Sequence, residues 1–487
     1  ILRHLYQPAL TEYYILNINI LNGNDYFSNS VQLFFLGLTI ISVWTLLDWF
    51  KINWYFKLLG AFLVITIPSV LLQATTTKND IVCSFFIITS VYFCLKSYYY
   101  FTFKNFIFLG ASIGLAFFTK GTSYLFLMPI LLVFGFSVLL KIFKDRSILV
   151  LLKGLIAILI ILIINFSLYL RNFKINGNVL NIDEIESKMY SNDQMNLAFF
   201  ISNLLKNSGL HLGYPIGEQS DRIIRDFHKK LEVDINSPKT NYFGTPYEGA
   251  VKISTHEDLV ANFMPFLLIF FCVMTLIING ISLFRHNKLN LLLGLVILLQ
   301  ILVFIVFLKW QPWHTRLHIP IFLLSIPLII VTSQRIKWYR YLLLFSLPFL
   351  VYGFFFYSFY NRIRPLSQNK SYTVNVQLSD DRYKKYFANQ LHLYPDYATI
   401  AGMMYTDAPK KIGVSLSDWE YPLFTNFYYN KVKIVTLNVN NSTAKIPQNL
   451  KEIDIIVTNY NQDFIEINGT KYLNQTPNQK FLYYYKK

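Results

Sequence analysis

Charged residues, and acidic residues above all, are scarce in this sequence. Only 15% of its 487 residues are charged, whereas 54% are hydrophobic and 17% are aromatic, and the mean hydropathy is +0.38. A soluble protein of this length could not cover its surface with so few charges. The shortage of charge excludes a water-soluble globular protein and indicates a chain embedded largely in a lipid bilayer.

Cysteines are also few. Cys83, Cys94 and Cys272 all lie in apolar stretches, which excludes a disulfide framework and a cysteine-based zinc site. A basic-then-apolar signal peptide is missing too, and the first residue is Ile1 rather than Met. We expect the chain to start partway into a longer protein.

Basic residues are in excess, with 44 Lys and Arg against 27 Asp and Glu and a formal net charge of +17. Such an excess is typical of nucleic-acid binding when the cations follow one face. Here they form short clusters between apolar runs, so we expect no nucleic-acid partner. We interpret them instead as topology signals and phosphate ligands.

Long apolar runs dominate the first three quarters of the chain. A transmembrane helix needs about 20 mostly apolar residues, and ten runs approach that length, the fourth and ninth being short. They are residues 29–50, 55–73, 81–100, 106–118, 123–140, 148–170, 263–284, 289–308, 317–331 and 338–360. Neither repeated halves nor interrupted spans are visible, which disfavours a transporter.

Lys and Arg accumulate in every second connection between these runs. Cytoplasmic connections retain Lys and Arg, so we place the enriched connections inside. They contain Lys51 and Lys57, Lys96 and Lys104, Lys141, Lys144 and Arg146, Arg285 and Lys288, and Arg335, Lys337 and Arg340. The alternation predicts a multi-pass protein of the plasma (inner) membrane whose active site faces the periplasm or exterior, and an outside start requires a further span upstream.

Three regions outside the membrane follow from this topology. Residues 1–28 have apolar positions at helical spacing and predict a pair of interfacial helices on the outer leaflet. Residues 171–262 form a large outer loop within the transmembrane domain, residues 29–360. In residues 361–487 the apolar runs shorten to strand length at 411–416, 432–437 and 453–457, and 418–429 is typical of a helix. The expected fold is an all-α polytopic membrane protein of about ten spans with a C-terminal extracytoplasmic α/β domain.

Ionisable residues at span ends are costly to desolvate, and several at one end of the bundle indicate a site. Asp80 opens the third span and could orient a hydroxyl or hold a cation, although it could equally cap the helix. Lys120 precedes Gly121 in a short outer turn, where its compact charge suits a phosphate; a lysine that snorkels to the interface is the alternative.

The densest cluster of cations, imidazoles and indoles spans residues 309–318. Arg316 could grip phosphate oxygens with its planar fork, with Lys309 beside it, and His314 could contact the substrate. An aromatic belt at the interface would explain Trp310 and Trp313 alone. Arg171 is a further candidate cation or an interfacial stop signal.

His256, Glu257 and Asp258 are three adjacent potential metal ligands. Adjacent residues rarely coordinate one ion without distant partners, so a helix start that these residues cap is the alternative interpretation for them. Asp25 lies in an Asn-Gly-Asn-Asp segment that indicates a turn.

Four segments together resemble the GT-C glycosyltransferases of the protein O-mannosyltransferase and aminoarabinose-transferase superfamily, labelled family 39. Residues 6–14, Tyr-Gln-Pro-Ala-Leu-Thr-Glu-Tyr-Tyr, are similar to the family's KPPL-x-YW segment, with Gln7 in place of Lys and Ala9 in place of Pro. Residues 77–80 resemble its acidic second outer loop, 119–121 its KG turn and 316–320 its RY-x-x-P segment. The resemblance covers most of residues 1–335.

The resemblance implies transfer of a hexose or pentose from a polyprenyl-phosphate donor to a hydroxyl of a lipid, glycan or protein acceptor on the outer face. We interpret Lys120, Arg316, Lys309 and Arg171 as ligands of the donor phosphate, and Asp80, Glu12, Gln7, His314 and His256 as candidates that contact the substrate or a metal. The family's catalytic Asp has no counterpart here and is expected upstream of Ile1. Transfer from such a donor requires no nucleotide-binding loop and no metal clamp, and we leave a divalent cation open as a cofactor. A lipid-linked glycan ligase and a polytopic transporter or flippase are the alternative functions.

Overall fold

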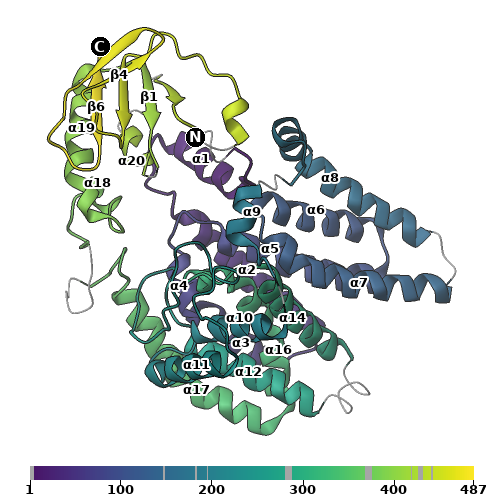
Figure 1. Cartoon of the computed structure of the whole chain (residues 1–487). Helices are drawn as coiled ribbons and strands as arrows, with labels where there is room; N and C mark the ends of the chain where they lie inside the picture. The colour runs from purple at the N-terminus through teal and green to yellow at the C-terminus, as the bar shows by residue number, and fades with distance from the viewer. Residues whose placement is uncertain are drawn as a thin grey trace.

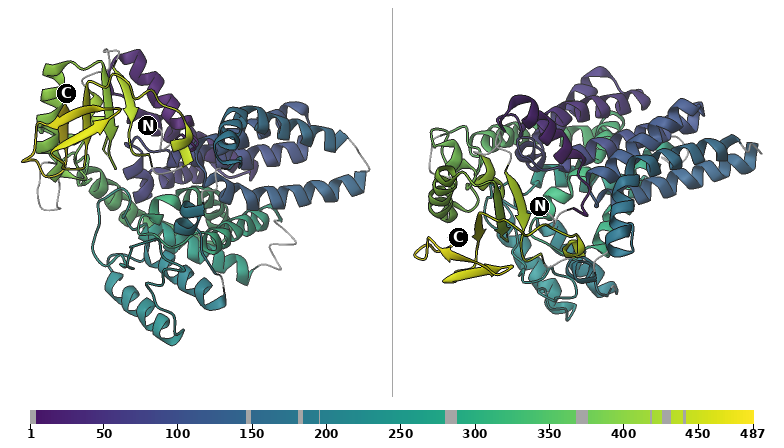
Figure 2. Two further views of the ribbon diagram at one scale, coloured as in Figure 1. Left: turned by 45° about the horizontal axis from the view of Figure 1, so that its top comes forward. Right: turned by 90° about the horizontal axis from the view of Figure 1, so that it is seen from above.

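A bundle of helices carries a six-stranded sheet at one end. The computed structural model describes residues 5–145, 149–180, 184–194, 196–279, 288–367, 376–417, 419–425, 432–439 and 442–487. Figure 1 shows the sheet beside the N-terminal helix α1 (Leu10–Asn22), while α6, α7 and α8 extend together away from it. The two views of Figure 2 show the same arrangement.

Helices occupy all ten apolar runs. They are α2 (Ser30–Trp49), α3 (Trp54–Thr66) with α4 (Pro68–Gln73), α5 (Asp80–Tyr100), α6 (Phe103–Thr119), α7 (Ser123–Asp145), α8 (Leu149–Asn176), α12 (Phe263–Ile278), α14 (Lys288–Phe307), α16 (Ile319–Arg335) and α17 (Lys337–Phe359). Within the described residues, α2, α5, α7, α8, α14 and α17 are long and apolar enough to cross a membrane, and α3, α6, α12 and α16 are apolar but shorter. The protein is therefore a multi-pass membrane protein, and the count of ten spans stays a prediction.

The second apolar run is broken, contrary to our expectation of uninterrupted spans. Ile67 precedes Pro68 and adopts an extended conformation (φ −69°, ψ 116°), because the proline ring disfavours helical geometry in the residue before it. The break leaves backbone N–H groups without intrahelical partners at the start of α4. Asn262 satisfies one of them, since its Oδ1 accepts a hydrogen bond from the Ser69 N–H at 2.9 Å.

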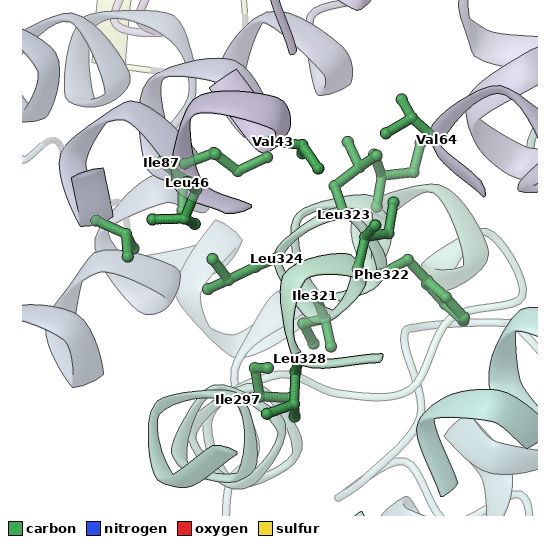
Figure 3. Close-up of a cluster of buried hydrophobic side chains, with 14 of the residues drawn as sticks. Val43, Leu46, Val64, Ile87, Ile297, Ile321, Phe322, Leu323, Leu324 and Leu328 are labelled. Atoms are coloured by element: carbon green, nitrogen blue, oxygen red, sulfur yellow. The ribbon is translucent and has the colours of Figure 1, made fainter. Parts of the chain in front are cut away.

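Helix α16 forms the centre of the bundle. Every residue from Ile319 to Ser333 is buried, as expected for a helix that is apolar on all sides. Figure 3 shows Leu323, Leu324 and Leu328 of this helix pointing in different directions, toward side chains of α2, α3, α5 and α14.

Helices α6 and α8 approach closely at two glycines. A methyl group added to Gly110 would lie 2.5 Å from the carbonyl oxygen of Ala157, and one added to Gly114 would lie 3.0 Å from Ile164. Small residues four apart allow helix backbones to pack closely where lipid offers no hydrophobic driving force. The α6–α8 contact therefore depends on the absence of side chains at these positions.

Shorter helices lie around the same end of the bundle as the sheet. Helix α1 is a single helix, so the predicted pair is wrong for the described residues: residues 5–9 form only a turn before it. The 171–262 loop contains α9 (Glu184–Tyr190), α10 (Leu197–Gly209) and α11 (Gly217–Lys230), and α15 (His314–Leu317) follows α14.

We call residues 361–487 the tail. It contains α18 (Arg382–Lys385), α19 (Tyr394–Asp407), α20 (Tyr421–Phe424), the 3-10 turns η2 (Leu391–Leu393) and η4 (Ser442–Lys445), and the strands β1 (Lys411–Ser415), β2 (Lys433–Thr436), β3 (Ile455–Thr458), β4 (Phe464–Ile467), β5 (Thr470–Asn474) and β6 (Tyr483–Lys486). The sheet order is β2-β1-β3-β6-β5-β4, with β2, β1 and β3 parallel and the others antiparallel.

The three predicted strands are confirmed as β1, β2 and β3. Within the predicted helix at 418–429 the structure has the short helix α20, and residues 418 and 426–429 of that prediction lie outside the described ranges. Asn468 and Gly469 both have positive φ (51° and 77°) and join β4 to β5, as the two-residue turn of a hairpin requires.

Candidate functional site

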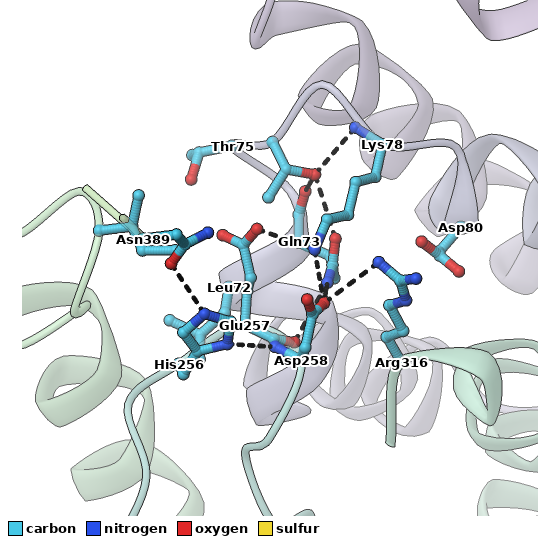
Figure 4. Close-up of polar contacts among 12 residues, drawn as sticks. Leu72, Gln73, Thr75, Lys78, Asp80, His256, Glu257, Asp258, Arg316 and Asn389 are labelled. Carbon is cyan, nitrogen blue, oxygen red and sulfur yellow. Dashed lines mark hydrogen bonds and ion pairs between the residues drawn. The ribbon is translucent and has the colours of Figure 1, made fainter. Parts of the chain in front are cut away.

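The candidate site lies at the tail-side end of the bundle, where α4 ends, α5 begins and α6 ends. In Figure 4, Lys78 reaches from the α4–α5 connection toward two acidic residues of the segment before α12. Its Nζ lies 2.9 Å from Glu257 Oε1 and 2.5 Å from Asp258 Oδ1. Arg316 Nη1 lies 3.4 Å from the same Asp258 oxygen, and Arg364 pairs with Glu257. Three cations and two carboxylates thus form one network.

Both carboxylates of this network are ionised at neutral pH. Burial alone would raise the pKa of Glu257, but the neighbouring charges of Arg364 and Lys78 outweigh burial and lower the pKa. Burial also opposes ionisation of Asp258, and Arg316 and Lys78 lower the pKa of that carboxyl in the same way. The network therefore carries one net positive charge.

A second charged group lies beside α5. Asp80 is 3% exposed and pairs with Lys120, which ends α6. Its other oxygen, Oδ2, is buried without a hydrogen-bond partner among the described residues. On the near face of α1, Glu12 Oε1 lies 3.4 Å from Asn79 Nδ2. An unpartnered buried carboxylate oxygen is costly, so Asp80 is suited to bind a hydroxyl or a cation.

Side-chain amides hold this end of the bundle in place. Gln32 of α2 donates to the Gln73 carbonyl at 2.9 Å and accepts from the Ile81 N–H at 2.8 Å, so it connects the end of α4 to the start of α5. Gln73 Nε2 donates in turn to the Glu257 carbonyl at 3.1 Å and to Asp258 Oδ1 at 3.2 Å. The break at Pro68 is part of this arrangement, because it redirects the chain so that Gln73 faces the acidic residues.

The structure brings only part of the predicted set together. Lys120 and Arg316 both lie at this end, each already paired with a carboxylate that is distant in sequence. Lys309 is buried and donates to Asp193 Oδ2 at 2.8 Å and to the Lys188 carbonyl at 2.7 Å. It therefore connects the segment after α14 to the 171–262 loop. Arg171 lies on α8, with its Nε buried and unpartnered among the described residues.

The remaining candidates, His314, His256 and Gln7, lie outside the two charged groups described above. His314 is completely buried, and its Nδ1 lies 2.8 Å from Asn207 Oδ1 of α10. His256 accepts from the Asp258 N–H and contacts Asn389 of the tail at 2.9 Å, and burial lowers its pKa, so the ring is neutral. Gln7 is exposed in the turn before α1.

Sequence reasoning missed the ion pairs of Glu257 and Asp258. The interpretation of residues 256–258 as a capped helix start is wrong, because α12 begins only at Phe263 and the acidic residues pair with cations instead. The available signal was electrostatic: two adjacent carboxylates beside an apolar span need cationic partners. Nothing local in the sequence indicates which cations these are.

A metal site was an open expectation. Within the described ranges, no three His, Cys, Asp or Glu side chains converge closely enough to hold an ion. The free oxygen of Asp80 is one ligand, and a protein-only site needs more. The residue types present favour electrostatic stabilisation by Lys and Arg.

The tail is joined to the bundle by a second set of contacts. Asp25, in the connection between α1 and α2, accepts from Arg382 Nη2 at 2.5 Å, Tyr386 Oη at 2.6 Å and Tyr421 Oη at 2.9 Å. Burial alone would raise the pKa of Asp25, but these hydrogen bonds lower it. Asp25 also makes the predicted turn, since its carbonyl accepts from the Ser28 N–H at 3.1 Å.

The lowered pKa values of Glu257 and Asp258 predict how the stability of the protein depends on pH. Their ion pairs contribute stability that is present above the unfolded-state pKa values of about 4.3 and 3.9, and that is lost as pH falls through the lower folded-state values. We expect the apparent Tm to be constant from neutral pH to about pH 5 and to fall below about pH 4. Thermal unfolding of the purified protein measures this, with a Glu257→Gln, Asp258→Asn double variant as the control that lacks the pairs. A fall centred near neutral pH in the wild type would attribute the effect to histidines instead.

Comparison with known proteins adds an independent observation. Residues 8–181 match the family model for dolichyl-phosphate-mannose-protein mannosyltransferase. No curated protein and no solved structure shows significant similarity to the chain. The matched region contains Glu12, Asp80 and Lys120 and ends after α8. Residues 8–181 therefore form a domain of the dolichyl-phosphate-mannose-protein mannosyltransferase family, within the GT-C superfamily of membrane glycosyltransferases that use a polyprenyl-phosphate-linked sugar.

Proposed function

We propose that the protein transfers a sugar from a polyprenyl-phosphate donor to a hydroxyl acceptor at the tail-side end of the bundle, and that this end faces the outside of the cell. The observation that carries the proposal is the meeting of Lys120, Asp80 and Arg316 at one end of the helices, with two of the three in the family-matched region. A lipid phosphate would lie at this depth, because its isoprenoid tail occupies the bilayer and its charge does not.

The cations support phosphate binding although they are already paired. Lys120 carries three N–H donors, and Asp80 accepts from it. Arg316 carries five donors; its Nη1 contacts Asp258, and its Nε is unpartnered among the described residues. Both therefore retain donors for phosphate oxygens. A methyl group added to Gly121 would meet nothing within 4 Å, so the space beside Lys120 is open to a ligand.

The reaction needs one bond to form as another breaks. The acceptor oxygen attacks the anomeric carbon, the bond from that carbon to the phosphate oxygen breaks, and its electron pair leaves with the polyprenyl phosphate. The hydroxyl proton is taken up by the leaving phosphate monoester, whose former bridging oxygen keeps the electron pair of the broken bond and becomes a terminal oxygen. Lys120 and Arg316 would stabilise the negative charge that develops on this oxygen, and Asp80 Oδ2 would orient the acceptor hydroxyl.

Transfer of a radiolabelled sugar from the donor to an acceptor tests the function directly. Purified full-length protein in lipid vesicles would be given a radiolabelled polyprenyl-phospho-sugar with and without a membrane extract as the acceptor source. We expect acceptor-dependent transfer of the label. Donor that remains intact with every polyprenyl-phospho-sugar supplied would contradict the proposal.

Orientation is testable by cysteine labelling. We expect a cysteine at Lys104 to react only after permeabilisation, and cysteines at Lys229 and Lys410 to react in intact cells, because the Lys-rich connections are retained in the cytoplasm. All three positions are exposed, and the native Cys83, Cys94 and Cys272 are buried, which keeps the background low. Equal labelling at Lys104 and Lys229 in intact cells would overturn the orientation.

A further inference from the structure

A cavity of about 820 Å³ lies between the bundle and the tail. Its walls come from α1 and the α1–α2 connection, the end of α4 and the α4–α5 connection, Glu257, the end of α17, and residues of the tail within 361–366, 376–389 and at 421. Pockets of about 300–1,000 Å³ are typical of small-ligand sites. Both the bundle and the tail line this space, and the contacts of Asp25, Glu257 and His256 with the tail lie around it.

The cavity is richer in positive than in negative charge. Its lining contains two carboxylates and four cations: Asp25, Glu257, Lys78, Arg364, Arg382 and Lys385. Hydrogen bonds and neighbouring cations hold the pKa values of Asp25 and Glu257 below their ordinary value, so both are charged and the positive excess persists at neutral pH.

Lys385 is the cation that these carboxylates do not neutralise. Its Nζ donates to the Leu378 carbonyl at 2.7 Å. Asp380 interacts with Lys385 electrostatically but is ion-paired with Lys384, and within the described ranges no carboxylate forms an ion pair with Lys385 itself. Arg382 is held by Asp25, and Arg364 and Lys78 share Glu257. A ligand with a negative group would therefore gain most by approaching Lys385.

The rest of the lining suits a hydroxyl-rich ligand. Gln377, Asn361 and Asn389 present amides, Thr75 and Thr77 present hydroxyls, and Figure 4 shows Thr75 and Asn389 on the side of the network away from Asp80. Tyr26 and Tyr421 are 65% and 45% exposed at the cavity. Amides that donate and accept, together with amphipathic rings, match the alternating hydroxyl and C–H faces of a carbohydrate.

The cavity also lies next to Arg316, one of the two proposed ligands of the donor phosphate. Lys78 lines the cavity and at the same time contacts Asp258, which contacts Arg316. A ligand in the cavity and a phosphate at Arg316 would thus lie on two sides of one ion-pair network. An acceptor whose anionic group binds in the cavity would extend past this network, so that its hydroxyl reaches Asp80 and the donor.

We propose that the cavity between the bundle and the tail binds an anionic glycan, a short carbohydrate segment that bears a carboxylate or a phosphate, as the acceptor. Lys385 recognises its negative group, and the amides and tyrosines recognise its hydroxyls. The proposal rests on the glycosyltransferase function for the role as acceptor, whereas binding itself does not depend on it.

Binding to the purified full-length protein tests the site. Calorimetry would compare three oligosaccharides of equal length: a neutral one, a uronic-acid one and a phosphorylated one. We expect at least one anionic oligosaccharide to bind roughly tenfold or more tightly than the neutral one, and the two anionic probes identify which group is preferred. Equal affinity for all three, or no binding of any, would overturn the proposal.

Neighbouring lysines of α18 provide a matched pair of variants. Lys385→Ala is expected to weaken anionic binding roughly fivefold to tenfold. Lys384→Ala should leave it unchanged, because Lys384 pairs with Asp380 and does not line the cavity. If both variants weaken binding equally, general surface charge and not the cavity is responsible.

Turnover separates this inference from the proposed function. With a donor present, Lys385→Ala should raise the KM for the anionic acceptor and leave kcat nearly unchanged, whereas Lys120→Ala should lower kcat without affecting glycan binding. Glycan binding that depends on Lys385 without any donor turnover would leave the site standing and refute the glycosyltransferase function. Donor turnover without glycan binding would support the glycosyltransferase function and refute the glycan site.

Discussion

Replacement of Lys120 or Arg316 by alanine is expected to lower sugar transfer roughly 10²–10³-fold, the effect of removing one electrostatic ligand of a developing negative charge. Both cations lie at the end of the bundle where a lipid phosphate would sit, and both retain N–H donors beyond those used in their ion pairs. Turnover of radiolabelled donor by purified variants measures the effect. Thermal unfolding shows whether each variant is still folded.

The pair between Lys120 and Asp80 requires a special control, because Lys120→Ala leaves the buried Asp80 carboxylate uncompensated. A Lys120→Met, Asp80→Asn double variant removes both charges and tests for recovery of stability without recovery of activity. Lys120→Arg should rescue poorly, since a guanidinium is larger than the ammonium held at Asp80. Lys229→Ala and Arg225→Ala, in the large loop, should be silent in transfer. If both alanine variants at the site transfer sugar at the wild-type rate, the cations are only interfacial anchors.

Glu257→Ala is expected to destabilise the protein by about 3–5 kcal/mol, the typical cost of removing one partner from a buried ion pair. Glu257 is 4% exposed and pairs with both Lys78 and Arg364. Its loss would leave two partly buried cations without that carboxylate and would release Arg364 at the start of the tail. The apparent Tm of the purified protein measures the loss.

Asp226→Ala is the matched control, because Asp226 pairs with Lys229 in an exposed position, where such pairs contribute about 0–1 kcal/mol. Protease sensitivity near Pro365 should rise in Glu257→Ala and remain unchanged in the control. A Glu257→Ala protein that melts with the wild type would show that the network does not hold the tail to the bundle.

The helices were predictable because their signal is local. Each of the ten apolar runs coincides with a helix or, at Pro68, with two, since a segment in lipid must satisfy its backbone hydrogen bonds within itself. The strands β1, β2 and β3 followed from short apolar runs in the same way. The hairpin of β4 and β5 was missed although Asn468 and Gly469 form a strong turn signal.

The candidate site was predictable only in its residue types. Lys120 and Arg316 were noticeable because a cation beside an apolar span is costly to desolvate and indicates a functional site. Their partners did not: Asp80 lies 40 residues from Lys120, and Arg364 lies 107 residues from Glu257. Lys309 and His314 fit the pattern equally well in sequence, yet the folded loop buries both.

The sequence by itself determined that this chain lies in a membrane, where its helices fall, and which end of them carries the unusual cations. Hydropathy and charge act over one helix length, so they can be read along the chain. Only the tertiary structure decided which charges meet, that Pro68 turns α4 toward Asp258, and that Asp25 holds the tail over a cavity. Ion pairs and cavities arise between segments distant in sequence, because desolvated charges must find partners wherever packing places them.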